Sequence, residues 1–397
     1  ENLSRKGRGF PDIDSITPTL TKKMRKIILI IFILFSSTAF VYGAELLQDK
    51  QEILKAKVID IIESTDKEIQ STGIVSKYQK VKAEILQGEQ QGQSIFIEND
   101  YIQLKKEQKF YLLKNTRFDD GKVTYAVSDV YRLPWIIFFV ILFIVLVVLF
   151  GGIQGLRGLL SLCGGLLLIF YLLLPQIIGG TSPILIGCIV ASLISIIGSY
   201  ITHGFNRTTT SAVIGMVATV IITGLLAYFA VYITNLSGMD SEEAMYLTIN
   251  SQGVINLQGL LLSGIIIGLL GVLYDSAIGQ AISVEELWRA DSKLSKSYVF
   301  KRSLRIGREH IGALVNTLSL AYVGAALPLL VLFSFPSYGS ANLLINRELF
   351  ATEIIRAMIG SIGLVLAVPI TTFISVWMLH GVKFKGQTHS HSHSHTH

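Results

Sequence analysis

The sequence predicts a mainly α-helical membrane protein, in which a polytopic bundle of transmembrane helices follows a small β-rich, OB-like domain. Three observations carry this prediction. The chain of 397 residues has a mean hydropathy of +0.55, only 16% of its residues are charged, and its apolar residues gather in runs of about 20 residues, the length of a membrane-spanning helix. Soluble domains carry about 25% charged residues, so the composition favours a membrane protein.

Residues 24–43 have the pattern of a secretory signal peptide. Arg25 and Lys26 precede an apolar core, and small residues suited to cleavage follow near Gly43 and Ala44. An uncleaved anchor is the alternative. Residues 1–23 show no packing face, and we interpret them as an upstream extension that is not part of the native protein.

Residues 44–133 form the one large polar block, with 14 Lys/Arg against 15 Asp/Glu. Four stretches rich in β-formers begin near residues 79, 93, 108 and 122 and are separated by turn residues. An earlier stretch, from Leu46, reads as a helix or a first strand. We expect a small extracytoplasmic β-barrel of the OB type or an open sandwich. Its near-neutral charge gives no basic face for nucleic acid.

Seven apolar stretches follow within a predicted transmembrane domain of residues 134–380, each near the length that crosses the hydrocarbon layer as a helix. They cover residues 134–153, 158–175, 183–202, 212–234, 255–275, 311–333 and 357–380. We therefore expect about seven spans after the cleaved signal.

The charges between the stretches predict the orientation. If residues 44–133 lie outside a bacterial plasma (inner) membrane, the inner loops carry eleven Lys/Arg and the outer loops only two. This bias obeys the positive-inside rule and places the tail, residues 381–397, in the cytoplasm. The inner segment 276–310 mixes apolar and basic residues, which predicts an amphipathic hairpin at the inner leaflet.

The fifth apolar stretch carries a carboxylate on a glycine face. Spacings of 4, 3, 4 and 4 residues place Asp275 on one face of a helix together with Gly264, Gly268, Gly271 and Gly279. Glycines let a neighbouring helix approach closely, so we expect a helix-packing face that turns Asp275 towards protein. An unpaired Asp at mid-membrane costs about 2.5–3.5 kcal/mol on insertion scales, and such residues usually pair or line a wet path.

The sixth stretch supplies candidate partners for this carboxylate. Asn316 lies on a face of mostly small residues, and we expect it at roughly the depth of Asp275. With His310 or Gln280 close by, the pair would hold a proton, a small cation or a substrate group. The equally open alternative is an interhelical hydrogen bond that only joins two helices.

The tail "THSHSHSHTH" alternates histidines. Such imidazoles chelate divalent transition metals without selective geometry, and the weak candidate ligands are His389, His391, His393, His395 and His397. Passive chelation or no role fits the tail better than metal transport. The nucleotide-binding, zinc-protease and hydrolase motifs are absent, so we expect neither an enzyme nor a bound cofactor.

Three segments resemble the YibE/F family of multi-pass bacterial membrane proteins. They are "GGIQGLRGLLSL" (151–162), "GLLGVLYDSAIGQAISVEEL" (268–287) and "RIGREHIGALVNTLSLAYVGAALPLLVLF" (305–333). The resemblance covers residues 44–380 and implies a signal or anchor, an extracytoplasmic domain and about seven or eight helices, but no biochemical role. The family motif falls on Asp275, Gln280, Arg305, Gly307, Arg308, His310, Asn316 and Thr317. Tyr274 stands where many members have a second acidic residue, which puts a mechanism with paired carboxylates in doubt.

Two functional hypotheses follow. In the first, the protein is permease-like and its Asp275–Asn316 site binds a proton or small cation on the path of a solute. In the second, it is a non-transporting scaffold or accessory factor in the lipid bilayer, whose outer β-domain binds a protein partner and whose polar spans serve packing.

Overall fold

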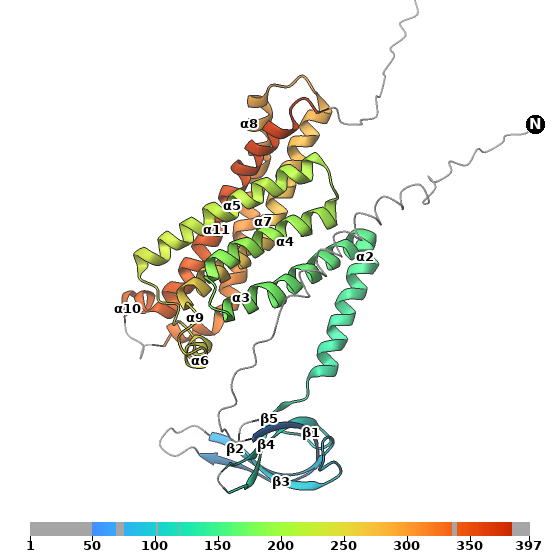
Figure 1. Cartoon of the computed structure of the whole chain (residues 1–397), viewed down its shortest axis with the longest axis vertical. Coiled ribbons are helices and arrows are strands. Elements are labelled where there is room, and N and C mark those ends of the chain that lie inside the picture. Colours follow the sequence, from blue (N-terminus) through green and yellow to red (C-terminus); the bar gives the residue numbers. More distant parts are fainter. Residues whose placement is uncertain (1–49, 69–74, 101, 119, 336–339, 383–397) are drawn as a thin grey trace, which may run out of the picture. The chain divides into compact units, whose positions relative to one another are not determined.

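The computed structural model describes residues 50–68, 75–100, 102–118, 120–335 and 340–382 (Figure 1). The fold is mainly helical, with an antiparallel sheet near the N-terminus. The chain divides into two compact units, one ending at Phe150 and the other beginning at Gly151. The expected extension (1–23), the expected signal peptide (24–43) and the five tail histidines lie outside the described residues.

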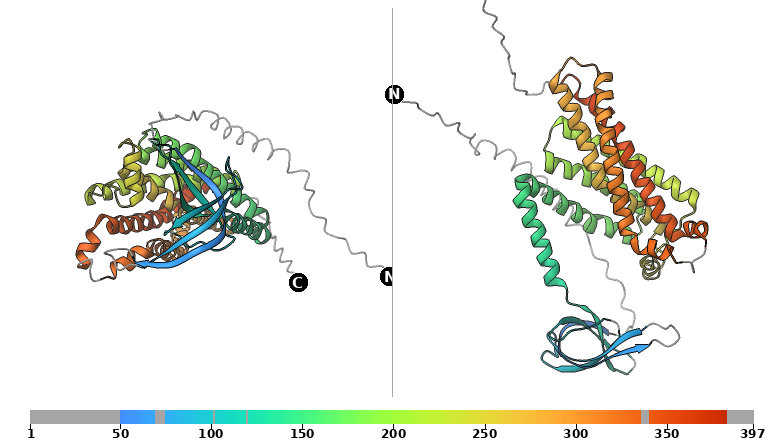
Figure 2. Two further views of the ribbon diagram at one scale, coloured as in Figure 1. Left: turned by 90° about the horizontal axis from the view of Figure 1, so that it is seen from below. Right: turned by 180° about the vertical axis from the view of Figure 1, so that it is seen from behind.

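The N-terminal unit is built on a five-stranded antiparallel sheet that curls into a half-barrel (Figure 2). The strands are β1 (Lys50–Glu68), β2 (Val75–Ile85), β3 (Ser94–Asn99), β4 (Lys109–Thr116) and β5 (Val123–Val130). Their order in the sheet is β3-β2-β1-β4-β5. The first half of the long β1 pairs with β4 and its second half with β2. The segment that read as a helix or a strand is therefore a strand.

The half-barrel closes over an apolar core because its strands alternate. Val81, Ala83 and Ile85 of β2 are fully buried, whereas the residues between them are partly exposed. One buried polar side chain fixes a loop to this sheet. The Gln79 amide accepts from the Leu104 N–H at 2.8 Å and donates to the Leu104 carbonyl at 3.1 Å. The core thus keeps its buried backbone groups paired.

The long apolar helix α2 (Leu133–Leu168) contains one break. At Gly152 the backbone has φ 54° and ψ −140°, a conformation that residues with a Cβ rarely adopt. None of the described side chains of α2 is buried, and its exposed residues are mostly large and apolar. The helix leads into the π-helical turn η2 (Ile169–Leu173) and the short α3 (Leu174–Ile178).

The C-terminal unit is a bundle of long helices. They are α4 (Pro183–His203), α5 (Arg207–Thr234), α7 (Leu257–Ala290), α8 (Lys296–Ala325) and α11 (Glu348–Leu379). Shorter helices are α6 (Glu242–Asn250), α9 (Leu327–Phe333) and α10 (Ala341–Asn346). Helices α5, α7 and α11 pack against one another at the centre, α4 lies against α5 and α7, and α8 lies against α7 and α11 (Figures 1 and 2).

Among the described residues, five helices are long and apolar enough to cross a membrane. A sixth crossing results if α8 and α9, bent by 68° relative to each other, form one span. The sequence predicted about seven spans because it separated residues 134–153 from 158–175. Those two stretches lie in one run of 46 residues, since Gly152 bends the helix but no turn follows it. The predicted number of spans is not confirmed.

The central pair, α5 and α11, is antiparallel and in register. Ser211 meets Ser375 with a hydroxyl–hydroxyl distance of 2.9 Å. One turn further on, Gly215 lies against Thr371, and two turns beyond that Thr223 lies against Gly363. A Cβ at Gly215 would approach the Thr371 Cα to 2.9 Å, and one at Gly363 would approach the Thr223 Oγ1 to 2.7 Å. Glycine on one helix thus accommodates threonine on the other, in both directions. We call this interface the α5–α11 seam.

The predicted amphipathic segment, residues 276–310, consists of the end of α7 and the start of α8. Its apolar residues do not form a separate hairpin, because Val284, Trp288 and Val299 pack with Val376 and Leu379 at the end of α11. Two helices of membrane length therefore extend into the predicted loop and leave only residues 291–295 between them.

Candidate functional site

The candidate site lies where α4 ends, α5 begins and α7 passes both. Gly204 ends α4 with φ 76°, which favours glycine. Asn206 then caps α5, because its Oδ1 accepts from the Thr209 N–H at 2.7 Å while its Nδ2 donates to the His203 carbonyl at 3.1 Å. This tight turn holds His203 and the first turn of α5 against α7.

Three ionisable groups meet beside this turn. The Nδ1 atom of His203 lies 3.0 Å from the Tyr274 hydroxyl, and the two rings are 5.8 Å apart. The same hydroxyl reaches the carbonyl of Gly198 at 3.4 Å. Asp275 is the next residue on α7, exposed on the helix surface and within electrostatic range of His203. The imidazole therefore has a phenol as a direct partner and a carboxylate as a near neighbour.

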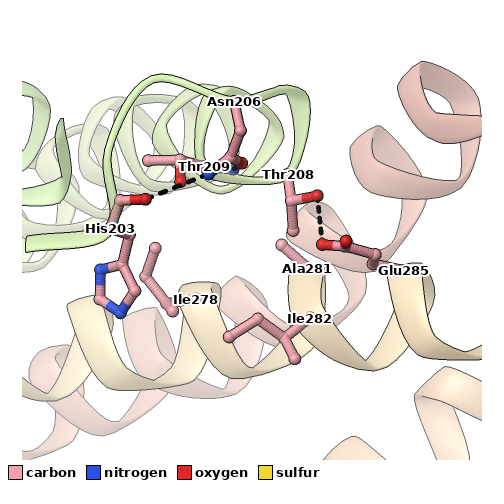
Figure 3. A pocket seen from close by; sticks show the side chains of 8 residues that line it. All are labelled: His203, Asn206, Thr208, Thr209, Ile278, Ala281, Ile282 and Glu285. Atoms are coloured by element: carbon pink, nitrogen blue, oxygen red, sulfur yellow. Dashed lines mark hydrogen bonds between the residues drawn. The ribbon is translucent and has the colours of Figure 1, made fainter. Parts of the chain in front are cut away.

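A pocket of about 130 Å³ opens next to His203 (Figure 3). Its wall is mixed: polar groups come from the α4–α5 turn, and α7 contributes three apolar side chains and one carboxylate. The lining residues are His203, Asn206, Thr208, Thr209, Ile278, Ala281, Ile282 and Glu285. The volume suits a few water molecules or a small hydrated ion.

The carboxylate of the pocket is held from two sides. Thr208 Oγ1 donates to Glu285 Oε2 at 2.5 Å. Arg289, one turn along α7, donates from Nε and from a terminal nitrogen to Glu285 Oε1 at 2.8 and 2.6 Å. Both carboxylate oxygens of Glu285 are thus held by hydrogen bonds. His203 contributes an imidazole to the same lining, and an imidazole has an ordinary pKa near neutrality.

The structure separates the residues that the sequence grouped with Asp275. Asn316 and His310 lie on the exposed surface of α8, and no hydrogen bond joins either of them to Asp275 in the described chain. Gln280 is buried, and its Oε1 accepts from Thr372 of α11 at 2.8 Å. Its amide nitrogen lies where a Cβ on Gly307 would be, so Gln280 joins α7, α8 and α11 instead of lining the pocket.

The expected pairing of Asp275 with Asn316 is therefore not seen. The reason is the rotation of α8 about its axis. The face of α8 that packs on the bundle carries Ser303, Gly307 and Leu318, which turns Asn316 outwards.

The predicted glycine face of α7 is mostly open. Positions for a Cβ on Gly264, Gly271 and Gly279 have no described atom within 4 Å, whereas Gly268 lies 3.3 Å from the Tyr322 hydroxyl. Close packing instead uses glycines on other helices, for example Gly187 of α4 against Ser263 of α7. Asp275 lies on this open face and is exposed as well.

The sequence did not identify His203, Tyr274 or Glu285 as site residues. His203 and Tyr274 are 71 positions apart, and no spacing rule connects them. One local signal was available: Gly204 and Asn206 are a helix stop and a helix cap around a single turn, which places His203 at a helix end.

The described residues contain no group of three or more His, Cys, Asp or Glu that could hold a metal ion. Comparison with known proteins gives one match, to a family model. No curated protein and no solved structure matches the chain. The family model of the YibE/F-like proteins matches residues 139–381, which include α4 to α11 with the pocket, the seam and Asp275. The chain therefore belongs to the YibE/F-like protein family.

Proposed function

We propose that this protein is a permease-like transporter of the bacterial plasma membrane, and that Asp275, His203 and Tyr274 form its site for a proton or small cation. An acidic group on an otherwise apolar helix costs about 2.5–3.5 kcal/mol where it lies deep in the bilayer, and such residues mark ion and proton paths. In this proposal His203 is the partner of Asp275, the role that the sequence analysis gave to Asn316.

The observation that carries the proposal is the 3.0 Å contact between His203 and Tyr274 beside Asp275. An imidazole gains or loses a proton near neutral pH, and an adjacent phenol can donate to it or accept from it. The pocket next to His203 supplies room for water. Together these groups can pass a proton between the pocket and the carboxylate of Asp275.

The direct test is flux in liposomes that contain the purified protein. An imposed gradient of H⁺, Na⁺ or K⁺ is followed with an internal dye for each ion. We expect the wild type to conduct at least one of them, and we expect Asp275→Asn and His203→Gln to lower that flux at least about tenfold, a loss of about 1.4 kcal/mol or more in transition free energy.

Glu309→Gln is the matched control, because it removes an exposed carboxylate from α8 without touching the site. The proposal is wrong if the wild type conducts none of the three ions, or if Asp275→Asn conducts as well as Glu309→Gln.

The charge bias between the loops supports an orientation with residues 44–133 outside and the C-terminus in the cytoplasm. In that orientation, with the stretches on either side of Gly152 crossing as two spans, the pocket opens towards the cytoplasm, because it lies at the α4–α5 turn. Protease added to intact cells should then cleave the β-rich unit, and cleavage that requires broken cells would reverse the orientation.

A non-transporting scaffold remains the second candidate, and the surface of α8 favours it. Gly312, Asn316 and Gly324 are exposed, and no described atom approaches a Cβ at either glycine. A scaffold predicts that Asp275→Ala lowers thermal stability and that residues 44–133 capture a protein partner. A stable Asp275→Ala variant without flux supports the transporter instead.

A further inference from the structure

The end of the bundle opposite the pocket carries a second set of charged residues. The loop between α5 and α6 is fastened to the start of α11 by Glu348. This carboxylate accepts from the N–H groups of Ser237 and Gly238 at 2.6 and 2.8 Å, and from the Ser237 hydroxyl at 2.9 Å. Gly238 has φ 81°, and a Cβ there would lie 2.5 Å from the Leu257 carbonyl oxygen. The loop is therefore pressed against the start of α7.

Arg356 connects this loop to α11. One terminal nitrogen of its guanidinium donates to Glu353 Oε1 at 2.6 Å, and the other lies 3.9 Å from Asp240 Oδ2. All three side chains are mostly buried, with exposed fractions of 31% for Arg356, 27% for Glu353 and 17% for Asp240. Partly buried ion pairs are screened less by salt than surface pairs. Because Asp240 lies outside α11, the ion pair joins two elements.

Polar groups without partners lie in the same region. The Nε of Arg356, the Tyr322 hydroxyl and the Thr352 hydroxyl are buried and have no hydrogen-bond partner among the described residues. Tyr322 lies within electrostatic range of Arg356 and Glu353. Its hydroxyl is 3.3 Å from where a Cβ would stand on Gly268 and on Gly360. Buried polar groups without partners are costly, which favours a second arrangement in which water reaches them.

The α5–α11 seam joins this region to the pocket. Gly363, which accommodates Thr223, follows Arg356 by about 10 Å along α11. Hydroxyls recur towards the other end of the seam, where Thr208 bonds Glu285 at the pocket wall. Pro369 lies between the two ends and cannot donate to the carbonyl of residue 365, so α11 has a natural bending point there.

We propose that Asp240, Glu353 and Arg356 form an ion-pair gate that closes the α5–α11 seam at the end opposite the pocket. Opening requires Arg356 to release Asp240, because this contact joins the loop to α11 two turns beyond the attachment at Glu348. The gate rests on the proposed transport function: a protein with the pocket open at one end and the gate closed at the other is in one state of an alternating-access cycle.

The test measures access of a reagent in water to Thr352, a buried residue next to Glu353, in the full-length protein in nanodiscs. A reporter thiol is introduced by Thr352→Cys in a background with Cys163→Ser and Cys188→Ser. Its rate of reaction with a charged, water-soluble maleimide is measured alone and together with Arg356→Gln or Asp240→Asn. We expect both gate variants to raise the rate at least about tenfold.

Arg347→Gln is the matched control, because Arg347 is an exposed arginine just before α11 outside the triad. Glu353→Gln should raise the rate less than Asp240→Asn, since Glu353 and Arg356 belong to the same helix. Unchanged labelling in both Arg356→Gln and Asp240→Asn overturns the gate, and so does an equal rise in Arg347→Gln.

Unfolding is separated from opening by a second reporter. In a chain that keeps Cys188 as its single thiol, a gate variant should leave labelling of this half-buried residue of α4 unchanged. An equal rise at Cys188 and at the introduced thiol means that the bundle has loosened as a whole, and it overturns the gate. Labelling needs no flux, so this result is independent of the Asp275 experiment.

Discussion

Substitution of Gly215 tests whether the α5–α11 seam holds the bundle together. In Gly215→Ala the new Cβ would lie 2.9 Å from the Thr371 Cα and from the Thr371 Cβ, whereas carbon atoms make favourable contact at about 3.5–4.0 Å. The obstacle includes backbone, so a change of rotamer cannot remove it. The helices must separate, and overpacking of this kind costs about 1–3 kcal/mol.

Gly264→Ala is the control, because no described atom lies within 4 Å of its Cβ position. Alanine is favoured over glycine in a helix interior by about 0.5–1 kcal/mol, and this gain is common to both variants. Their difference isolates the clash. At about 2–4 °C per kcal/mol for a domain of this size, Gly215→Ala should melt at least about 2 °C below Gly264→Ala.

The assay is thermal unfolding of the purified full-length variants, followed by tryptophan fluorescence in one detergent. Thr371→Ala should rescue Gly215→Ala only in part, because it removes the nearest atom, Thr371 Oγ1, but leaves the Thr371 Cα in place. Equal melting temperatures for the two glycine variants refute the packing argument. A Gly264→Ala protein that is the less stable of the two would show that another helix covers the open face of α7.

Two further predictions concern residues of the bundle with contrasting environments, and a third concerns the β-rich unit. Gln280→Ala should lower the free energy of unfolding by about 1–3 kcal/mol, because it leaves the buried Thr372 hydroxyl without its Gln280 partner and opens space beside Gly307. Asn316→Ala should stay within about 0.5 kcal/mol of the wild type, because Asn316 is exposed. Denaturant titration measures the free energy of unfolding of both variants. A larger loss in Asn316→Ala than in Gln280→Ala would contradict the placement of these two residues. In the β-rich unit, the Arg132 guanidinium and the Val130 N–H hold the pKa of Asp129 below its usual range. This contribution to stability is present above the unfolded pKa of about 3.9 and is lost as the pH falls through the lower folded pKa. Asp129→Asn should therefore flatten the acid limb of a curve of stability against pH. An unchanged acid limb would exclude Asp129 as the source of that pH dependence.

The sequence predicted which residues form helices and strands better than it predicted how each helix is rotated about its own axis. The strands of the half-barrel follow from alternation, because residues such as Val81, Ala83 and Ile85 share a face by the period of a strand. The small and polar face of α8 was also recognised, but periodicity identifies a face without saying what covers it. The structure packs α8 through Gly307 and leaves Asn316 exposed.

The candidate site was predicted only through Asp275. Its neighbour His203 comes from another helix, and the contact depends on how α4 and α5 turn at Gly204 and how far α7 extends past them. Arg356 is one of the two basic residues that the sequence placed in the outer loops, because its charge lies outside the apolar stretch 357–380. In the structure α11 begins at Glu348, so Arg356 lies two turns inside the helix, where a charge needs partners.

The in-register seam also limits how related sequences can diverge. Each position on α5 faces one position on α11, so the two residues share a fixed volume. A larger side chain at 215 requires a smaller one at 371, and the same exchange links 223 with 363. Homologues should therefore change size at these positions in opposite, correlated steps. Positions 264, 271 and 279, which share no such volume with a described neighbour, should vary independently.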